Sequence, residues 1–486
     1  MSGPLILGID EGTTAVKAAL FDAQLRPVAA ARRVVGVRHP QPGWVEKDPL
    51  EILEAVVDLV AELLADAPGA VVACGLDHEG ESVLAWDAAT GAPLSPVLVW
   101  QDKRAEAILD DLGEHEEEIR TRSGLPLDPY FSAGKLAWLL RHDPAVRDAA
   151  SDGRLRLGTV DAFLGDRLGA GFATDASTAS RTQLHRPGSP GWDDRLLELF
   201  DVPVDTLPAV GDSVGALGTL RHERWAQDLP LTARACDQQA ALAGSACVAP
   251  GRVKATYGTG VFVLAHAGDA VPAAPAGLLP TVAWRVGGRD TFALDGGVFA
   301  AGAMLDWLTS ELGLAESPQA LGELARTVPD ARGARVLPAL AGLGAPWWEP
   351  GARALLAGID GGTTRAHLAR AALEGVAWRV ADIVGAVSET VPVDALRVDG
   401  GLTNEPLLLQ LQADAIGVPV DAAGADATVA GIAGLAAVGA GLLGSVAELA
   451  PLLPADRRVA PAVDDATRTA AHDAWQAFVR RASALG

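Results

Sequence analysis

Two short segments of glycine and threonine are the residues of this sequence best suited to hold a phosphate. Gly12-Thr13-Thr14 and Gly258-Thr259-Gly260 each stand between two apolar runs with strand character. Turns of this kind present free backbone amides, hydroxyl groups and a closely approachable backbone, which together bind phosphate oxygens. A single turn is weak evidence, but one in each half of the chain indicates two clamps on one polyphosphate.

Three charged residues near these segments have side chains that suit phosphoryl transfer. Asp10 ends an apolar run directly before the first turn, where it either caps the turn or holds Mg²⁺ through water molecules. Lys17 either neutralises phosphate charge or is a solvated lysine. Asp237, in CDQQAAL, either caps a helix or accepts the proton of an attacking hydroxyl group.

Length and composition limit the class of protein. A chain of 486 residues predicts at least two domains. The formal net charge of −23 argues against a nucleic acid or a membrane as partner, although helix N-termini and backbone amides still allow a small anionic ligand. Three cysteines without a CxxC motif favour a reducing compartment. The N-terminus has no features of a signal peptide, so we expect a cytoplasmic protein.

Alternating strands and helices are predicted around the candidate residues. Residues 5–10 and 15–23 indicate two strands joined by the first turn, and residues 252–266 indicate a second such arrangement. An amphipathic helix is predicted over 48–67, with a proline at its first position. The apolar run 428–444 is rich in glycine and alanine, which predicts a buried helix and not a membrane span.

The string GIDEGTT at residues 8–14 returns as GIDGGTT at residues 358–364. The second copy precedes a helical apolar stripe and is predicted to open a long helix, whereas the first copy joins two strands. The better internal repeat pairs the two strand–turn–strand segments. Two halves that each present such a segment to a shared cleft predict a duplicated nucleotide-binding fold.

Over about residues 5–445 the sequence resembles the FGGY family of carbohydrate kinases. YFSAGKLAWLLRH and GIDGGTTRAHLARAALEGVAW are similar to the two signatures of that family. Within it, GWVEKDPLEI, VLVWQDKR, STASRTQL and GLGAPWWEPGARALLAGI are most similar to glycerol kinases. The resemblance implies an α/β fold with two actin-like (ribonuclease H-like) ATPase domains, expected at residues 1–246 and 247–486, and a catalytic cleft between them.

The resemblance also implies a role for individual residues. Asp237 is the expected catalytic base and Asp10 the expected magnesium-associated aspartate. ATP is expected to contact Thr13, Thr14, Lys17, Thr259, Gly302, Gly401 and Asn404. The substrate is expected to contact Glu81, Trp100, Tyr130, Asp237, Gln238, Phe262 and His78. The adenine contact falls at Asn404 or Glu405, and Asp306 stands where the family usually has glutamine.

The sequence departs from the glycerol kinase pattern at the substrate pocket. Glycerol kinases have NQRET where this chain has HEGES at residues 78–82, so the usual arginine is Gly80. Either His78 or Glu79 fills the gap and glycerol is the substrate, or the vacated volume admits a longer polyol or a ketose. A tetritol, a pentitol or xylulose would be of that kind. Cys236, beside the expected base, is interpreted as buried packing.

Two classes of function are therefore weighed. The first is an ATP-dependent kinase of a small polyol, glycerol before others, that forms a homodimer or homotetramer by analogy with the family. The second is a regulator that binds a sugar or nucleotide without turnover. The joint presence of Asp10, Glu81 and Asp237 argues against the regulator, because a degenerate binder is expected to lose the base first.

Overall fold

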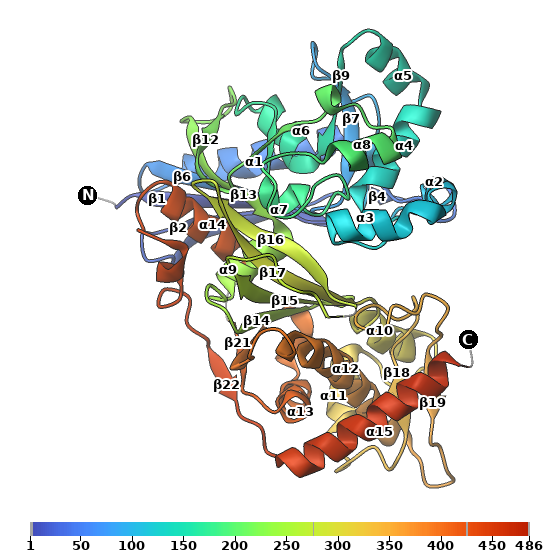
Figure 1. The fold of residues 1–486 in the computed structure, drawn as a ribbon. Helices are drawn as coiled ribbons and strands as arrows, with labels where there is room; N and C mark the ends of the chain where they lie inside the picture. Colours follow the sequence, from blue (N-terminus) through green and yellow to red (C-terminus); the bar gives the residue numbers. More distant parts are fainter. Residues whose placement is uncertain (1–2, 276, 424–425, 485–486) are drawn as a thin grey trace.

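The computed structural model describes residues 3–275, 277–423 and 426–484 (Figure 1). One mixed sheet of thirteen strands runs through both halves of the molecule. In chain order its strands are β1 (Leu5–Glu11), β2 (Ala15–Phe21), β3 (Pro27–Val34), β6 (Val71–His78), β12 (Val214–Leu220), β13 (Leu229–Cys236), β14 (Arg252–Tyr257), β15 (Val261–Gly268), β16 (Leu279–Val286), β17 (Arg289–Val298), β20 (Ala395–Asp399), β21 (Val420–Ala422) and β22 (Arg457–Val459). Their order across the sheet is β22-β21-β20-β14-β15-β17-β16-β12-β13-β6-β1-β2-β3.

Shorter strands form smaller sheets beside the large one. They are β4 (Val37–Arg38), β5 (Glu46–Lys47), β7 (Val83–Asp87), β8 (Val97–Leu98), β9 (Leu155–Thr159), β10 (Ala173–Asp175), β11 (Ala209–Gly211), β18 (Arg335–Leu337) and β19 (Leu355–Ala357). The helices are α1 (Pro49–Ala65), α2 (Glu106–Asp111), α3 (Glu116–Ser123), α4 (Ser132–His142), α5 (Pro144–Ser151), α6 (Val160–Arg167), α7 (Ala176–Ala179), α8 (Asp194–Phe200), α9 (Asp237–Gly244), α10 (Gly302–Ser310), α11 (Pro318–Ala325), α12 (Arg365–Ser388), α13 (Pro406–Ile416), α14 (Ala427–Gly439) and α15 (Asp465–Ser483).

The two halves of the large sheet repeat one arrangement of strands. β1 pairs antiparallel with β2 and parallel with β6, and β14 pairs antiparallel with β15 and parallel with β20. Each of the two predicted turns joins the first two strands of its half, which confirms the predicted repeat. The halves meet where β12 pairs with β16 at Val214 and Val286. The second GIDGGTT string leads into α12, as predicted.

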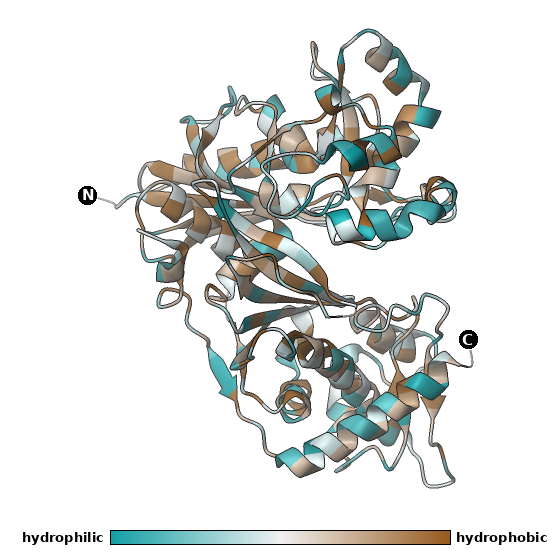
Figure 2. Cartoon of the chain, in the orientation of Figure 1, coloured by the Kyte–Doolittle hydropathy of each residue, from teal (hydrophilic) through white to brown (hydrophobic). Residues whose placement is uncertain are grey.

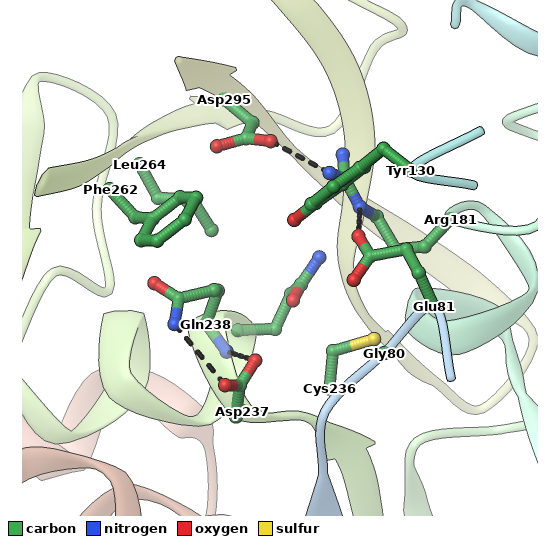
Figure 3. Close-up of a pocket in the computed structure, with 11 residues that line it drawn as sticks. Gly80, Glu81, Tyr130, Arg181, Cys236, Asp237, Gln238, Phe262, Leu264 and Asp295 are labelled. Carbon is green, nitrogen blue, oxygen red and sulfur yellow. Dashed lines mark hydrogen bonds and ion pairs between the residues drawn. The ribbon is translucent and has the colours of Figure 1, made fainter. Parts of the chain in front are cut away.

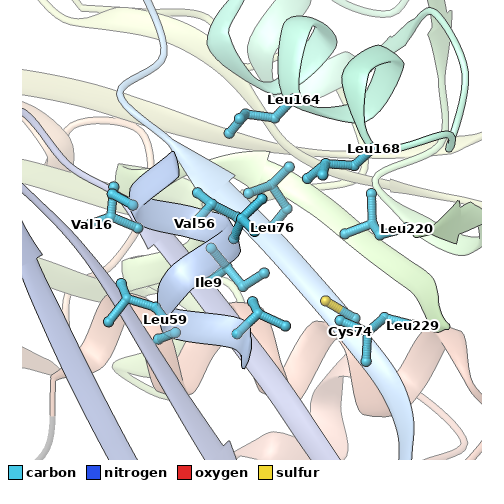
Figure 4. Packing of buried hydrophobic residues seen from close by; sticks show 14 of the residues in the cluster. Ile9, Val16, Val56, Leu59, Cys74, Leu76, Leu164, Leu168, Leu220 and Leu229 are labelled. Carbon is cyan, nitrogen blue, oxygen red and sulfur yellow. The ribbon is translucent and has the colours of Figure 1, made fainter. Parts of the chain in front are cut away.

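The core of the first half lies between β1, β6 and α1. Both strands are buried along their length and apolar up to their C-terminal ends, as expected of strands covered on both faces. α1 turns Val56 and Leu59 toward Ile9 and Val16 of the sheet (Figure 4). Figure 2 shows mainly apolar residues around β1 and β6, mainly polar residues on α3, and a mixture of both along α15.

α14 confirms the prediction of a buried helix in the apolar run near residue 430. It follows the second half in sequence but packs on β1, β6, β13 and α9 of the first half. Glycines permit this approach, because a Cβ on Gly8 would lie 2.6 Å from the carbonyl oxygen of Val429. Within the described ranges, no helix is long and apolar enough to cross a membrane. The division of the chain at residue 246 stays a prediction.

Candidate active site

A small pocket lies where strands and helix ends from both halves of the chain meet. It is small and partly open: the space between its walls is about 260 Å³, which includes open solvent. Its walls are Gly80, Glu81, Tyr130, Arg181, Cys236, Asp237, Gln238, Gln239, Phe262, Leu264 and Asp295. The structure thus brings together five of the predicted substrate residues, Glu81, Tyr130, Asp237, Gln238 and Phe262.

Carboxylates lie on several sides of this pocket. Figure 3 shows Asp237 and Asp295 on opposite sides of the open space, with Phe262 on one flank and Glu81 on the other. Carboxylate oxygens accept hydrogen bonds from hydroxyl groups, and the aromatic ring can pack against C–H groups. The pocket therefore matches a small ligand that carries several hydroxyl groups.

Asp237 is the first residue of α9 and follows directly after β13. Its Oδ1 accepts a hydrogen bond from the backbone N–H of Gln238 at 2.6 Å. Burial raises the pKa of Asp237 to about 7, the negative charges of Glu81 and Asp10 add to this effect, and Lys254 opposes it. A carboxylate with a pKa near neutral pH accepts a proton more readily than an ordinary aspartate does.

Arg181 follows α7 and holds two carboxylates of the pocket. Its Nε donates to Oε1 of Glu81 at 2.7 Å, and its Nη2 lies 2.9 Å from Oδ2 of Asp295. The guanidinium carbon is 5.9 and 5.4 Å from the ring centroids of Tyr130 and Phe131. Neither Arg181 nor Asp295 was predicted from the sequence as a site residue. The sequence did contain a signal for each. Arg181 stands in the small polar segment STASRTQL, and Asp295 stands in the apolar strand FALDGG, where an unpaired charge is costly.

Cys236 occupies the space above Gly80. A Cβ on Gly80 would overlap the Cys236 sulfur and would lie 3.7 Å from Cγ of Arg181. The thiol is buried, and burial raises its pKa well above the ordinary value, so it is a packing group and not a nucleophile. The expectation of a vacated volume at position 80 is therefore wrong.

The predicted substrate contact of His78 is also corrected. His78 is fully buried, and its Nε2 lies 3.0 Å from Oγ1 of Thr178 and 3.3 Å from Asp161, away from the pocket walls. Glu79 pairs with Lys47 at 2.7 Å and does not line the pocket either. Neither side chain fills the gap at Gly80, because both are engaged in buried polar clusters behind the pocket.

Aromatic contacts connect the pocket with the first Gly-Thr turn. Trp100 packs edge-on against Tyr130 and Phe262, with centroid distances of 5.5 and 6.3 Å. Its indole Nε1 donates to Oγ1 of Thr13 at 3.1 Å. Phe262 follows the second turn by two residues, so one chain of contacts links both turns to the pocket. The hydroxyl of Thr14, in the first turn, belongs to an exposed residue that a ligand can reach.

Acidic residues gather directly before the first turn. Lys17 lies 3.3 Å from Oδ2 of Asp10 and 2.5 Å from Oδ2 of Asp426, the residue that precedes α14. Burial raises the pKa of Asp10 despite the charge of Lys17. The adjacent Asp77 is fully buried, and its two oxygens have no hydrogen-bond partner among the described residues. Buried acceptors of this kind suit a nearby cation.

This acidic group fits a magnesium ion that arrives with a nucleotide. In the described part of the chain, no three histidine, cysteine, aspartate or glutamate side chains form a ready metal cage. Mg²⁺ does not need one, since it keeps several waters and binds one or two carboxylates together with phosphate oxygens. Asp10 would be its protein partner.

The second turn is bounded by the other predicted nucleotide residues. The N–H of Gly302, the first residue of α10, donates to the carbonyl of Gly258 at 3.2 Å, and a Cβ on Gly302 would overlap that carbonyl. Thr259, the residue after Gly258, is exposed. Gly401 and Asn404 form a 3₁₀ turn after β20, in which Nδ2 of Asn404 donates to the carbonyl of Gly401 at 3.1 Å.

Glu405, the alternative adenine contact, is already engaged. Its carboxylate accepts from the N–H of Leu407 at 2.9 Å and pairs with Arg326 at 2.5 Å. Both carboxylate oxygens of Glu405 are engaged, whereas the Asn404 side chain is engaged through Nδ2, which favours Asn404 as the adenine contact. Asp306 is exposed on α10.

Lys254 is a further site residue without a sequence-based assignment. It lies on β14, is fully buried, and its Nζ donates to Oε1 of Gln238 and, at 3.0 Å, to Oγ1 of Thr256. Burial lowers its pKa, and the nearby Asp399 and Asp237 raise it. Lys254 thus orients Gln238 beside the candidate base.

Two family models match this chain. The N-terminal domain of the FGGY family of carbohydrate kinases matches residues 5–244, and the C-terminal domain of the same family matches residues 253–440. Together these ranges contain every candidate site residue described above.

Individual relatives agree with the family match. The chain is 45% identical over 438 residues to a glycerol kinase of Alkalilimnicola ehrlichii, with 88% of each chain covered. It is 41% identical to a glycerol kinase of Halorhodospira halophila, with 98% of this chain and 96% of the relative covered. The structure superimposes on that of a Plasmodium falciparum glycerol kinase with ADP at a TM-score of 0.92, with 29% identity and coverage of 99% and 98%. A xylulose kinase structure from Brucella ovis gives a TM-score of 0.89, with 25% identity and coverage of 99% and 100%.

Proposed function

The chain belongs to the FGGY family of carbohydrate kinases, and from this premise we propose that it transfers the γ-phosphoryl group of ATP to glycerol. The products are glycerol 3-phosphate and ADP. One observation supports this proposal most directly. Two carboxylates, Asp237 and Glu81, share one small pocket, and the pKa of Asp237 is about 7. Side-chain contacts link this pocket to both Gly-Thr turns.

The pocket explains how a small polyol is held. Hydroxyl groups of the substrate donate to the carboxylates of Glu81 and Asp237. The rings of Tyr130 and Phe262 pack against its C–H groups, and Trp100, which does not line the pocket, packs behind both rings and helps to exclude water. Exclusion of water favours transfer to the alcohol over hydrolysis of ATP.

The transfer itself moves one proton and one phosphoryl group. Asp237 accepts the proton of a terminal hydroxyl group, and the freed oxygen forms a bond to the γ-phosphorus. The bond from that phosphorus to the β–γ bridging oxygen breaks, and ADP leaves. Thr13, Thr14 and Thr259 bind phosphate oxygens through hydroxyl and amide groups. A magnesium ion at Asp10 would neutralise part of the phosphate charge.

A longer polyol or a ketose, such as a tetritol, a pentitol or xylulose, is the second candidate substrate. The likeness to the xylulose kinase structure from Brucella ovis, at 25% identity and a TM-score of 0.89, supports it. The sulfur of Cys236 favours the smaller glycerol, because it fills the space beside Gly80. We therefore place glycerol first.

A coupled ADP-release assay tests the proposal. It compares glycerol, erythritol, threitol, xylitol, ribitol, dihydroxyacetone and xylulose at equal concentrations with Mg·ATP. We expect the highest kcat/KM with glycerol and a loss of at least about a thousandfold in kcat for Asp237→Ala. Equal and negligible ADP release with all seven compounds, from protein that binds ATP, would contradict the proposal.

We also expect a cytoplasmic protein that assembles as a homodimer or homotetramer. The three cysteines are free and buried, as suits a reducing compartment. The assembly is proposed by analogy with the family, and sedimentation analysis of the purified protein measures it directly.

A further inference from the structure

One guanidinium group joins carboxylates from the two halves of the chain inside the pocket. Arg181 belongs to the first half, and Asp295 lies on β17 in the second half. The Arg181 and Glu81 side chains are 6% and 8% exposed, and that of Asp295 is 11% exposed. At this depth a charge is costly unless it is paired, so the three side chains fix one another's positions.

We propose that Arg181 and Asp295 form a specificity-determining pair for the acceptor substrate. Arg181 is a positioning residue that holds the carboxylates of Glu81 and Asp295 against the pocket. Asp295 accepts a hydrogen bond from the hydroxyl group farthest from the one that is phosphorylated. This inference rests on the proposed function, because it assumes that the reacting hydroxyl group lies at Asp237.

The placement of the carboxylates supports this assignment. Asp237 and Asp295 lie on opposite sides of the open space in Figure 3, and Glu81 lies between them on one flank. With one hydroxyl group of a three-carbon polyol at Asp237, we expect the other two to face Glu81 and Asp295. Three hydroxyl groups then meet three carboxylates.

Free hydrogen-bonding atoms remain on both members of the pair. Oδ2 of Asp295 faces Arg181, and no hydrogen bond to its Oδ1 occurs among the described residues. Nη1 of Arg181 is buried, and it too lacks a hydrogen-bond partner in that part of the chain. A polyol hydroxyl group both donates and accepts, so it can satisfy groups of this kind.

A second buried ion pair, between β16 and β17, lies outside the pocket and is interpreted as structural. Arg285 on β16 pairs with Asp290 on β17 at 2.5 Å, with side chains 7% and 8% exposed. Arg285 also donates to the carbonyl of Ser189 at 2.6 Å. Neither Arg285 nor Asp290 lines the pocket. This pair therefore serves as a matched control of equal burial.

The experiment removes the proposed contact from the enzyme and from the substrate in turn. Wild type, Asp295→Asn, Asp295→Ala, Arg181→Lys and the control Asp290→Asn are assayed with glycerol and with propane-1,2-diol, which lacks one terminal hydroxyl group. Binding of both compounds without ATP is measured by calorimetry, so that binding is judged separately from turnover. Circular dichroism confirms that each variant is folded.

We expect Asp295→Ala to raise KM and Kd for glycerol about tenfold or more and to change kcat little, since a hydrogen bond to a charged group is lost. Its values for propane-1,2-diol should stay close to those of wild type, so that the preference for glycerol shrinks. Asp295→Asn should lie between Asp295→Ala and wild type. Arg181→Lys should weaken the binding of both compounds, because Glu81 loses its partner. Asp290→Asn should leave the preference unchanged.

Other outcomes separate this inference from the proposed function. If Asp295→Ala weakens the binding of glycerol and of propane-1,2-diol equally, or weakens the binding of neither, the inference is overturned while the kinase assignment stands. If wild type binds glycerol but releases no ADP, the proposed function fails and the binding data alone decide about Asp295. If wild type neither binds nor phosphorylates glycerol, both proposals are overturned.

Discussion

The sulfur of Cys236 fills the space that a side chain on Gly80 would need. The two residues meet because β13 and β6 are neighbouring parallel strands, and Cys236 pairs with His78 two residues before the glycine. The small residue and the larger one are therefore complementary, and the pair sets the size of the pocket on this side.

This complementarity predicts how the pair responds to substitution. Gly80→Ala should destabilise the protein by about 1–3 kcal/mol, because the added methyl group overlaps a packed sulfur. Cys236→Gly in the same chain should relieve most of that loss. Urea unfolding of the two single variants and the double variant measures the coupling. Strictly additive effects of the two substitutions would show that they do not share this space.

The raised pKa of Asp237 predicts a pH dependence of the reaction. The base accepts a proton only when it is ionised, and burial raises its pKa to about 7. The value of kcat/KM should therefore fall about tenfold per pH unit below pH 7 and level off above it. A stopped assay between pH 5.5 and 9 measures this, and an acidic limb centred near pH 4 would contradict it.

A buried ion cluster beside the first Gly-Thr turn predicts a large effect on stability. Lys47 lies 2.5 Å from Oε1 of Glu11 and 2.7 Å from Oε1 of Glu79, and it donates to the carbonyl of Gly12 at 3.3 Å. Lys47→Met leaves two buried carboxylates without a cation, which should cost about 3–5 kcal/mol of unfolding free energy.

Two further variants isolate the role of that charge. Glu79→Gln should recover part of the loss when it is combined with Lys47→Met, because it removes one unpaired charge. Lys103→Met, at an exposed lysine, is the control and should change the unfolding free energy little. A Lys47→Met protein as stable as wild type would refute the role of this cluster.

The position of Asp10 predicts a change in magnesium requirement. Asp10→Asn keeps the shape of the side chain but removes the charge that attracts the ion. The Mg²⁺ concentration for half-maximal rate should rise about 10- to 100-fold, the usual cost of losing an outer-shell partner. Initial rates over a magnesium titration at fixed ATP test this, and an unchanged half-maximal concentration would speak against Asp10.

Local sequence patterns predicted the elements that carry the site. The strand pairs around Gly12 and Gly258, the helix after Asp48 and the long helix α12 all form where periodicity and turn residues place them. These features depend on neighbours in sequence. Asp237 directly follows β13 and was a candidate base from its own residue type and position, whereas Glu81, three residues after β6, was predicted only from the family resemblance.

The residues that were missed depend on contacts distant in sequence. Arg181 and Glu81 are 100 residues apart, and no local pattern indicates that they meet. His78 was wrongly assigned because it lies two residues before Gly80, whose missing side chain it was expected to replace. Successive strand residues point to opposite faces, so closeness to a pocket in sequence does not give the direction of a side chain.

The placement of α14 has a consequence for how this chain can be divided. A polypeptide that ends at residue 246 would leave bare the glycine-lined faces of β1 and β6, on which α14 packs. The remaining polypeptide would carry a nearly all-apolar helix with nothing to cover it. Expressed separately, the two pieces would be insoluble, and they would become soluble only when made together in one cell.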